Sequence, residues 1–431
     1  MRPHSYERFR RKALGEEPAG YVRARSVAVG PTVAELTDAS EEELWALHRR
    51  RSVSGAGSPG PEEAPLGEGR APARGGAGGE ARGASLLDLK LELARRLLGP
   101  CRLCFLRCPV DRRAGERGAC GLGPGLRPYQ DFVHLGEELE LIPTHAFYLA
   151  GCSYRCVYCS DWAQVARPGE VGEVPAEVLA RSVDARRREG ARSLSWVGGS
   201  PDVNLPGILE VLALLRCSVP VVWNGNLSNT EEAHELLSGV VDAWVADLKY
   251  GCEECSRSGS GIAGALAVAR RNLRRIAGEA YTVVRHLLLP GHLECCTLPV
   301  LDWLREEVPG VRVNLLDQYQ APGRLRGSPW DRAVVAADLA RARSHAEDLG
   351  LDLAGPGPLP PSGGVAGAAE SAGAAPAAGF SSALRLGSSG EVVVENLSPE
   401  LAPLLEALGE LTPELRARLR AGGAWRPAPG P

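Results

Sequence analysis

The chain has 431 residues, 44% of them hydrophobic, and a formal net charge of −4, so it is long enough for a large core with appendages. Acidic and basic residues are mixed along it, which excludes the basic field of an electrostatic nucleic-acid binder. We find no apolar run of membrane-spanning length and no signal-peptide pattern at the start. We therefore expect a cytoplasmic protein with neither a nucleic acid nor a membrane as partner.

The first predicted element is a helix at residues 37–51, which begins acidic and ends basic. Asp38 and Ser40 are both suitable residues for its N-cap. Residues 52–84 follow, with Gly, Ala, Pro, Arg and Glu but no aromatic side chain. Such a segment buries too little apolar area to offset the entropy of ordering, so we expect a flexible linker.

The next segment begins the cysteine-containing part of the chain. Cys101 and Cys104 form a CxxC pair, and Cys108 and Cys120 follow. Four thiolates close a zinc site or saturate an iron–sulfur cluster, and their spacing does not decide between the two. All 12 cysteines lie between Cys101 and Cys296, which in a reducing compartment indicates metal or redox chemistry rather than disulfides.

A second cysteine motif follows the apolar run at residues 145–151. Cys152, Cys156 and Cys159 have the spacing CxxxCxxC. Three thiolates hold three irons of a four-iron cluster and leave the fourth iron open. A zinc knuckle or a set of buried thiols is the alternative, but zinc usually takes four ligands from paired CxxC units. The spacing therefore favours an iron–sulfur cluster with one exchangeable position.

From residue 141 to residue 354, short apolar runs alternate with amphipathic stretches. The expected strands are 146–150, 193–197, 219–223, 243–248, 282–289 and 311–316. The expected helices are 175–190, 206–216, 229–238, 262–277, 297–307 and 331–348. Six such units predict an α/β fold, a partial (β/α)6 TIM-like barrel, with ligands at the carboxyl ends of the strands.

Residues suited to ligand contact follow several of these strands. Gly198 and Gly199 allow close approach of a ligand to the backbone. Asn224 lies at the end of the third strand. It is suited either to ligand contact or to an ordinary turn. Asp247 and Lys249 share one face of the fourth strand, because side chains alternate between faces, and they form either a cofactor contact or an ordinary ion pair.

The fifth strand and two further cysteine pairs complete this set. Neighbouring residues on a strand point to opposite faces, so only one of Arg285 and His286 faces the barrel interior. The remaining thiols are Cys252 and Cys255, the vicinal pair Cys295 and Cys296, and Cys217. The two pairs follow strands four and five and are candidates for metal binding or radical chemistry, with ordinary thiols as the alternative. We expect Cys217 to be a buried residue that behaves as a small hydrophobic side chain.

The C-terminal part begins with a second low-complexity segment. After it, residues 391–395 predict a strand, and residues 401–408 and 413–419 predict helices. The expected organisation is an N-terminal extension at 1–51, a disordered linker at 52–84, a cysteine-rich metal-binding segment at 85–140, the partial barrel at 141–354, a disordered linker at 355–380 and a small C-terminal module at 381–431.

The order of these motifs resembles the radical S-adenosylmethionine superfamily. The cysteine loop at residues 152–159 is followed by Gly-Gly-Ser-Pro at 198–201, Asp-Leu-Lys-Tyr at 247–250, Val-Arg-His-Leu-Leu-Leu-Pro-Gly at 284–291 and Asn-Leu-Leu-Asp-Gln-Tyr at 314–319. Over about residues 99–323 the chain is similar to an uncharacterised branch of pyruvate formate-lyase activating enzyme-like proteins. The pattern from Cys101 to Cys120 belongs to the same resemblance.

The resemblance implies a cofactor, an activity and partners. A 4Fe–4S cluster on Cys152, Cys156 and Cys159 would bind S-adenosylmethionine, whose reductive cleavage gives a 5′-deoxyadenosyl radical that abstracts hydrogen. A protein such as flavodoxin or ferredoxin would donate the electron. The substrate is unknown, and a glycine of a partner protein is one candidate. The candidate cofactor-binding residues are Tyr158, Gly198, Gly199, Asn224, Asp247, Lys249 and His286.

Two points stay open at this stage. The cysteines at 101, 104, 108 and 120 are expected to bind either a second iron–sulfur cluster or zinc. Ser200 stands where the family usually has an acid, so only the backbone contact of this motif is carried over. The alternative function is a noncatalytic scaffold that binds zinc or an iron–sulfur cluster.

Overall fold

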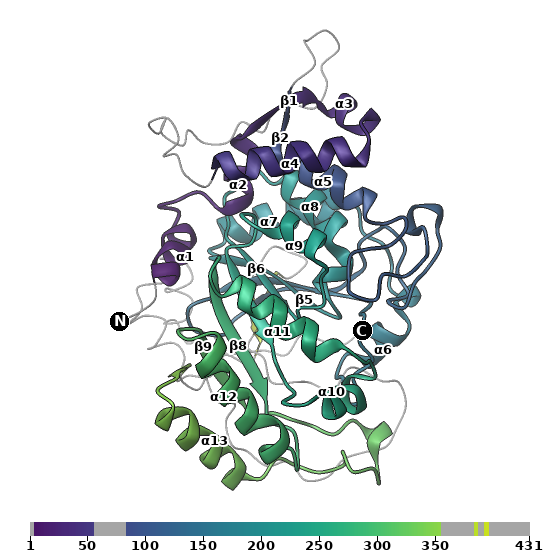
Figure 1. Cartoon of the computed structure of the whole chain (residues 1–431). Coiled ribbons are helices and arrows are strands. Elements are labelled where there is room, and N and C mark those ends of the chain that lie inside the picture. The colour runs from purple at the N-terminus through teal and green to yellow at the C-terminus, as the bar shows by residue number, and fades with distance from the viewer. Residues whose placement is uncertain (1–3, 56–82, 355–382, 387–391, 396–431) are drawn as a thin grey trace.

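The computed structural model describes residues 4–55 and 83–354, and the backbone of two strands at 383–386 and 392–395 (Figure 1). Most of the first predicted linker, the whole of the second and the helices expected at 401–408 and 413–419 lie outside the described residues. The strand expected at 391–395 is confirmed as β12.

A ten-stranded open sheet forms the centre of the described structure, in the order β10-β9-β8-β7-β6-β5-β4-β3-β11-β12. Strands β4 to β10 are parallel, and β3, β11 and β12 add antiparallel pairs at one edge. The six expected parallel strands are β4 to β9, so the partial barrel is confirmed. The strands are β1 (Ala28–Thr32), β2 (Gly83–Ser85), β3 (Pro128–His134), β4 (Thr144–Leu149), β5 (Ser193–Gly198), β6 (Val221–Gly225), β7 (Ala243–Asp247), β8 (Tyr281–Leu287), β9 (Arg312–Leu316), β10 (Asp352–Leu353), β11 (Ala383–Leu386) and β12 (Val392–Glu395).

Helices follow the parallel strands as the sequence predicts, and all six expected barrel helices are present. The helices are α1 (His4–Leu14), α2 (Gly20–Ser26), α3 (Val33–Asp38), α4 (Glu41–Gly55), α5 (Leu86–Arg96), α6 (Trp162–Ala166), α7 (Ala176–Arg188), α8 (Leu205–Leu214), α9 (Glu231–Leu237), α10 (Glu253–Ser260), α11 (Ala265–Ile276), α12 (Leu298–Glu307) and α13 (Ala336–Asp348). Within the described ranges, no helix combines the length and the apolar character that crossing a membrane requires.

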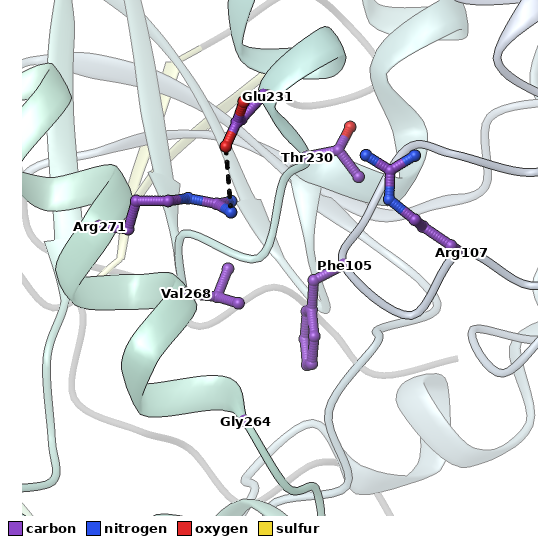
Figure 2. A pocket seen from close by; sticks show the side chains of 7 residues that line it. All are labelled: Phe105, Arg107, Thr230, Glu231, Gly264, Val268 and Arg271. Carbon is purple, nitrogen blue, oxygen red and sulfur yellow. Dashed lines mark ion pairs between the residues drawn. The ribbon is translucent and has the colours of Figure 1, made fainter.

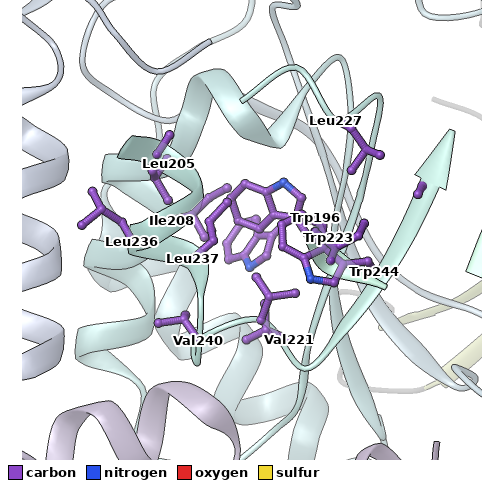
Figure 3. Close-up of a cluster of buried hydrophobic side chains, with 14 of the residues drawn as sticks. Trp196, Leu205, Ile208, Val221, Trp223, Leu227, Leu236, Leu237, Val240 and Trp244 are labelled. Atoms are coloured by element: carbon purple, nitrogen blue, oxygen red, sulfur yellow. The ribbon is translucent and has the colours of Figure 1, made fainter. Parts of the chain in front are cut away.

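One row of aromatic side chains fixes which face of the sheet packs against the helices (Figure 3). Trp196, Trp223 and Trp244 are in register on neighbouring strands β5, β6 and β7, and all three are buried. They pack with the apolar residues of α8 and α9, including Ile208. Because strand side chains alternate, the residue after each tryptophan points to the opposite face, which we call the inner face. Asn224, after Trp223, therefore lies on the inner face.

The N-terminal helix α1 covers the amino end of the inner face. Tyr6 and Phe9 pack against Tyr281 at the start of β8, in one buried cluster with residues of β6 and β7. At the end of α1, Lys12 donates to the buried carboxylate of Asp242 over 2.5 Å. Side chains of α1 thus fill the amino end of the inner face, whereas the cysteine loop lies at the carboxyl end of the parallel strands.

The structure also shows where the expected N-terminal helix begins. α4 starts at Glu41, and the Ser40 side chain accepts from the backbone N–H of Glu43, while Glu43 accepts from the backbone N–H of Ser40. Ser40 is therefore the cap, and Asp38 ends the separate helix α3. Residues 52–55 continue α4 and Gly83–Ser85 form β2, so the ordered structure enters both ends of the expected linker.

Candidate active site

The cysteine loop leaves β4 at the carboxyl edge of the parallel sheet. Gly151 turns the chain with a φ of 77°, a conformation that favours glycine. Cys152 is buried, and Cys156 and Cys159 are partly buried. Arg155 holds the loop, because its guanidinium donates to the backbone carbonyl oxygens of Cys152 and Tyr154 over 2.6 and 2.8 Å. The three thiols therefore lie on one braced loop.

The loop is also tied to the helix that follows β7. The backbone N–H of Arg155 donates to Ser260, and that of Val157 donates to Gly259, both over 2.9 Å. The backbone N–H of Tyr154 donates to the sulfur of Cys152 over 3.3 Å. The end of α10, which follows the cysteine loop by about a hundred residues, thus helps to fix the position of the loop.

The thiols are in surroundings that disfavour a bare negative charge. Burial raises the pKa of Cys152, Cys156 and Cys159, the last to about 12. The sulfur of Cys156 raises the pKa of Cys152 and of Cys159 further. The ammonium group of Lys249 opposes the effect of burial at Cys156, because its positive charge lowers the pKa of the thiol. A thiolate here needs a cationic partner, which a metal ligated by the sulfurs supplies.

Gly198 and Gly199 lie directly against the start of the cysteine loop. The backbone N–H of Gly199 donates to Leu149 over 2.7 Å. A Cβ atom at Gly199 would come within 2.2 Å of the carbonyl oxygen of Gly151, and one at Gly198 within 2.5 Å of the backbone nitrogen of Leu149. Both glycines are therefore required by the close packing of β4 against the end of β5.

Several buried polar atoms around this edge have no partner within the described residues. They are Ser153 Oγ, Ser200 Oγ, Asn224 Nδ2 and Asn226 Oδ1. Buried polar groups are nearly always hydrogen-bonded, so these four atoms are available to bind a polar group at this edge. The Asn226 side chain also donates to the sulfur of Cys152 over 3.6 Å. Three thiols and nearby free donors and acceptors fit a cluster with a polar cofactor.

Asp247 and Lys249 meet at the end of β7, as the alternation of the strand predicts. The Lys249 ammonium lies 2.7 Å from the Asp247 carboxylate. Burial by itself lowers the pKa of Lys249, but Asp247 and the sulfur of Cys156 raise it overall. The lysine therefore stays charged next to the cysteine loop.

Tyr158 belongs to an aromatic wall beside the loop. Its hydroxyl is hydrogen-bonded to that of Tyr250, and its ring lies 5.7 Å from Tyr319 and 5.6 Å from Trp330, centroid to centroid. Burial raises the pKa of both hydrogen-bonded tyrosines, so they stay neutral. Tyr250, which the sequence did not single out, thus links the end of β7 to the cysteine loop.

Comparison with known proteins identifies this arrangement. Residues 148–304 match the model of the family described as the radical SAM superfamily. A Methanocaldococcus jannaschii protein, "Uncharacterized protein MJ0674", is 33% identical over 276 residues, which cover 62% of this chain and 80% of that protein. The chain belongs to the radical SAM superfamily. The radical SAM domain supports an enzyme that uses S-adenosylmethionine.

Solved structures with some likeness to this chain include Streptococcus suis SuiB. The free protein matches 48% of this chain at 16% identity with a TM-score of 0.36, and the form bound to S-adenosylmethionine matches 47% at 16% identity with a TM-score of 0.37. The match spans 47% of either SuiB chain, about half of its length.

On β8 of the radical SAM domain, the expectation for His286 needs correction. His286 is fully buried on the helix-covered face, where Nδ1 is 2.8 Å from the carbonyl oxygen of Leu248 and Nε2 is 3.0 Å from the hydroxyl of Thr297. Burial lowers its pKa to about 4. Both ring nitrogens are engaged, so His286 has none to offer a cofactor on the inner face.

Arg285 faces the inner side instead. Its guanidinium pairs with Glu137 and Glu138, the latter at 2.8 Å, and Asn314 donates to Glu138 over 2.9 Å. The carboxylates raise the pKa of Arg285 although its burial opposes them. This charged group could not be predicted from local spacing, because Glu137 and Glu138 lie in the loop after β3 and precede Arg285 by almost 150 positions.

The cysteine-rich segment packs beside the cysteine loop of the radical SAM domain. Cys101, Cys104 and Cys120 are buried and Cys108 is partly buried. Burial raises the pKa of Cys104 to about 12, and the other three sulfurs add to the shift. The four are therefore neighbours, but no three of these described sulfurs lie within 4.8 Å of one another.

A separate cleft of about 270 Å³ lies outside this edge, between the cysteine-rich segment, α9 and α11 (Figure 2). The residues that line it are Phe105, Arg107, Thr230, Glu231, Gly264, Val268 and Arg271. Arg271 pairs with Glu231 across it, and Arg107 pairs with Glu232. Phe105 connects it to the cysteine loop, since its ring meets Tyr154 edge-on at 6.1 Å. None of the candidate cofactor-binding residues lines this cleft.

Proposed function

We propose that the chain is a radical enzyme that holds a 4Fe–4S cluster on Cys152, Cys156 and Cys159. The observation that supports this best is one braced loop with three thiols at the carboxyl edge of a parallel sheet, beside buried polar atoms without partners. When bound, the cluster and S-adenosylmethionine together supply a 5′-deoxyadenosyl radical that abstracts hydrogen from a substrate.

The residues around the loop have distinct roles in this proposal. S-adenosylmethionine would be held by the backbone at Gly198 and Gly199 and by the unpartnered side-chain amide of Asn224. The ammonium group of Lys249 would pair with its carboxylate. Tyr158 and Tyr250 form a neutral wall that limits water at the loop. Asp247 holds Lys249 in place.

The substrate we propose is a glycine of a partner protein, as the similarity to activating enzymes implies. The position of α1 supports an approach from the carboxyl edge, because Tyr6 and Phe9 fill the amino end of the inner face. A flavodoxin-like or ferredoxin-like protein is the proposed electron donor. The four cysteines from Cys101 to Cys120 are proposed to hold a second cluster, with zinc as the alternative.

Anaerobic reconstitution tests the proposal. We expect the protein, supplied with iron, sulfide, S-adenosylmethionine and a reductant, to form 5′-deoxyadenosine, which chromatography measures. The iron content is expected to be about four per chain for one cluster and about eight for two. Iron at this level with no 5′-deoxyadenosine would instead support the noncatalytic scaffold.

Replacing Gly199 by Ala is expected to impair this reaction. The new Cβ would press on the carbonyl oxygen of Gly151 and displace the cysteine loop. A shift of about 1 Å in a catalytic group costs roughly 100-fold in rate, which is the loss we expect in 5′-deoxyadenosine formation. Gly172→Ala is the matched control, since a Cβ there meets no atom within 4 Å. Equal rates for both variants would refute this role of Gly199.

A further inference from the structure

A third group of metal-ligating side chains packs near the cysteine loop but shares no residue with either cysteine motif. Cys255 lies in the first turn of α10, which follows β7. His292, Cys295 and Cys296 lie in and just before a short π-helix at Leu293–Thr297, which follows β8. The three sulfurs and the His292 nitrogen all lie within 4.8 Å of one another. Within the described residues, no other group of three or more ligand atoms is this close.

The distances match one tetrahedral ion. The sulfur of Cys295 lies 3.7 Å from that of Cys255 and 3.9 Å from that of Cys296. His292 Nδ1 lies 3.3 Å from the sulfur of Cys295 and 3.8 Å from that of Cys296. Zinc bonds of about 2.3 Å to sulfur and 2.0–2.1 Å to nitrogen place tetrahedral ligands about 3.6–3.8 Å apart. A disulfide would need sulfurs about 2.05 Å apart.

We infer that Cys255, His292, Cys295 and Cys296 form a mononuclear zinc site. Four protein ligands close the coordination shell, which is typical of structural zinc and leaves no open position for a substrate. The site is distinct from the proposed cluster, because it shares no ligand with Cys152, Cys156 or Cys159.

The surrounding residues prepare this geometry. The His292 ring stacks on Trp330, with centroids 5.0 Å apart and planes 17° apart, which fixes the direction of Nδ1. The backbone N–H of Thr297 donates to His292 over 3.1 Å and closes the wide π turn that carries Cys295 and Cys296. A Cβ at Gly251 would lie 2.5 Å from the carbonyl oxygen of Cys295, so glycine lets the two segments approach.

The position of the site gives it a role in supporting the mouth of the barrel. Zinc there would join the segment after β7 to the segment after β8. The first of these segments carries Lys249 and Tyr250. The hydroxyl of Tyr250 is hydrogen-bonded to that of Tyr158 in the cysteine loop. The ion would thus hold the wall beside the cysteine loop without taking part in the reaction.

Zinc content measured by plasma mass spectrometry tests the inference. Cys295→Ser and His292→Ala are expected to lose about one zinc per chain relative to the wild-type protein, with iron content after reconstitution unchanged. Cys295 is exposed, so its substitution opens no core cavity. Any zinc held by the four cysteines from Cys101 to Cys120 would be the same in all variants and would cancel in the difference.

Cys252→Ser is the matched control. Its sulfur caps α10 by accepting from the backbone N–H of Cys255 over 3.4 Å, and serine preserves this cap. We expect Cys252→Ser to keep its zinc and to melt at a lower temperature in the presence of a chelator, as the wild type does. The melting temperature of Cys295→Ser should fall less in the chelator than that of the wild type or Cys252→Ser.

Three outcomes would overturn the inference. The first is equal zinc content in the wild type, Cys295→Ser and His292→Ala. The second is loss of zinc in Cys252→Ser, which would assign the site to a different ligand set. The third is a disulfide between Cys255 and Cys295 in protein purified and alkylated under reducing conditions. Tetrahedral thiolate absorption after cobalt substitution, lost in Cys295→Ser, would give independent support.

Discussion

Replacing Cys156 by Ser is expected to abolish 5′-deoxyadenosine formation by the reconstituted protein. The Cys156 side chain is partly buried near Lys249, and iron–sulfur clusters select soft thiolate ligands over a serine hydroxyl. Loss of partners that only orient metal ligands costs about 10–100-fold, so loss of a ligand itself should exceed 100-fold. Chromatography of the reaction products and the iron content per chain measure both consequences.

Cys217→Ser is the matched control for this experiment. Cys217 is also partly buried, but it lies after α8 next to Asp184 and away from the cysteine loop. This variant should keep wild-type iron and wild-type 5′-deoxyadenosine. If Cys156→Ser retained the activity of Cys217→Ser, the cysteine loop would not be the cluster site.

Replacing Lys12 by Met is expected to lower the free energy of unfolding by about 3–5 kcal/mol, as is usual when one partner of a buried ion pair is removed. The Asp242 carboxylate also accepts from the backbone N–H groups of Gly20 and Val221, but its charge would lose its only ammonium partner among the described residues. Denaturation in urea, followed by circular dichroism, measures the change.

Arg95→Ala provides the comparison for Lys12→Met. Arg95 pairs with Glu210 over 3.0 Å, but both side chains are largely exposed. Exposed pairs contribute about 0–1 kcal/mol, so this variant should unfold close to the wild-type midpoint. Similar midpoints for the two variants would contradict the role of α1 in anchoring the amino end of the barrel.

Much of the barrel could be predicted from local patterns. The six strands β4 to β9 are short apolar runs, and each is followed by an amphipathic stretch, so their positions follow from the pattern of burial. The pairing of Asp247 with Lys249 was also predictable, because both residues lie on one strand and alternation puts them on one face. The N-terminal helix α1 was missed, although Tyr6, Phe9 and Ala13 have helical spacing.

The orientation of β8 could not be predicted in this way. Alternation requires Arg285 and His286 to face opposite sides but does not say which side each takes. The choice depends on Glu137 and Glu138, which meet Arg285, and on Thr297, which meets His286. These partners are distant in the chain and come together only when the sheet forms.

The sequence by itself determined the cysteine motif and the order of the six barrel strands and their helices, because both depend on residues that are close along the chain. Only the tertiary structure decided that Cys255 meets His292, Cys295 and Cys296. These residues are about 40 positions apart, and hydrogen bonding between β7 and β8 brings the segments that follow them to one edge of the sheet. A ligand set within one loop can therefore be predicted from the spacing of its residues. A ligand set that comes from two loops depends on the strand pairing that brings those loops together.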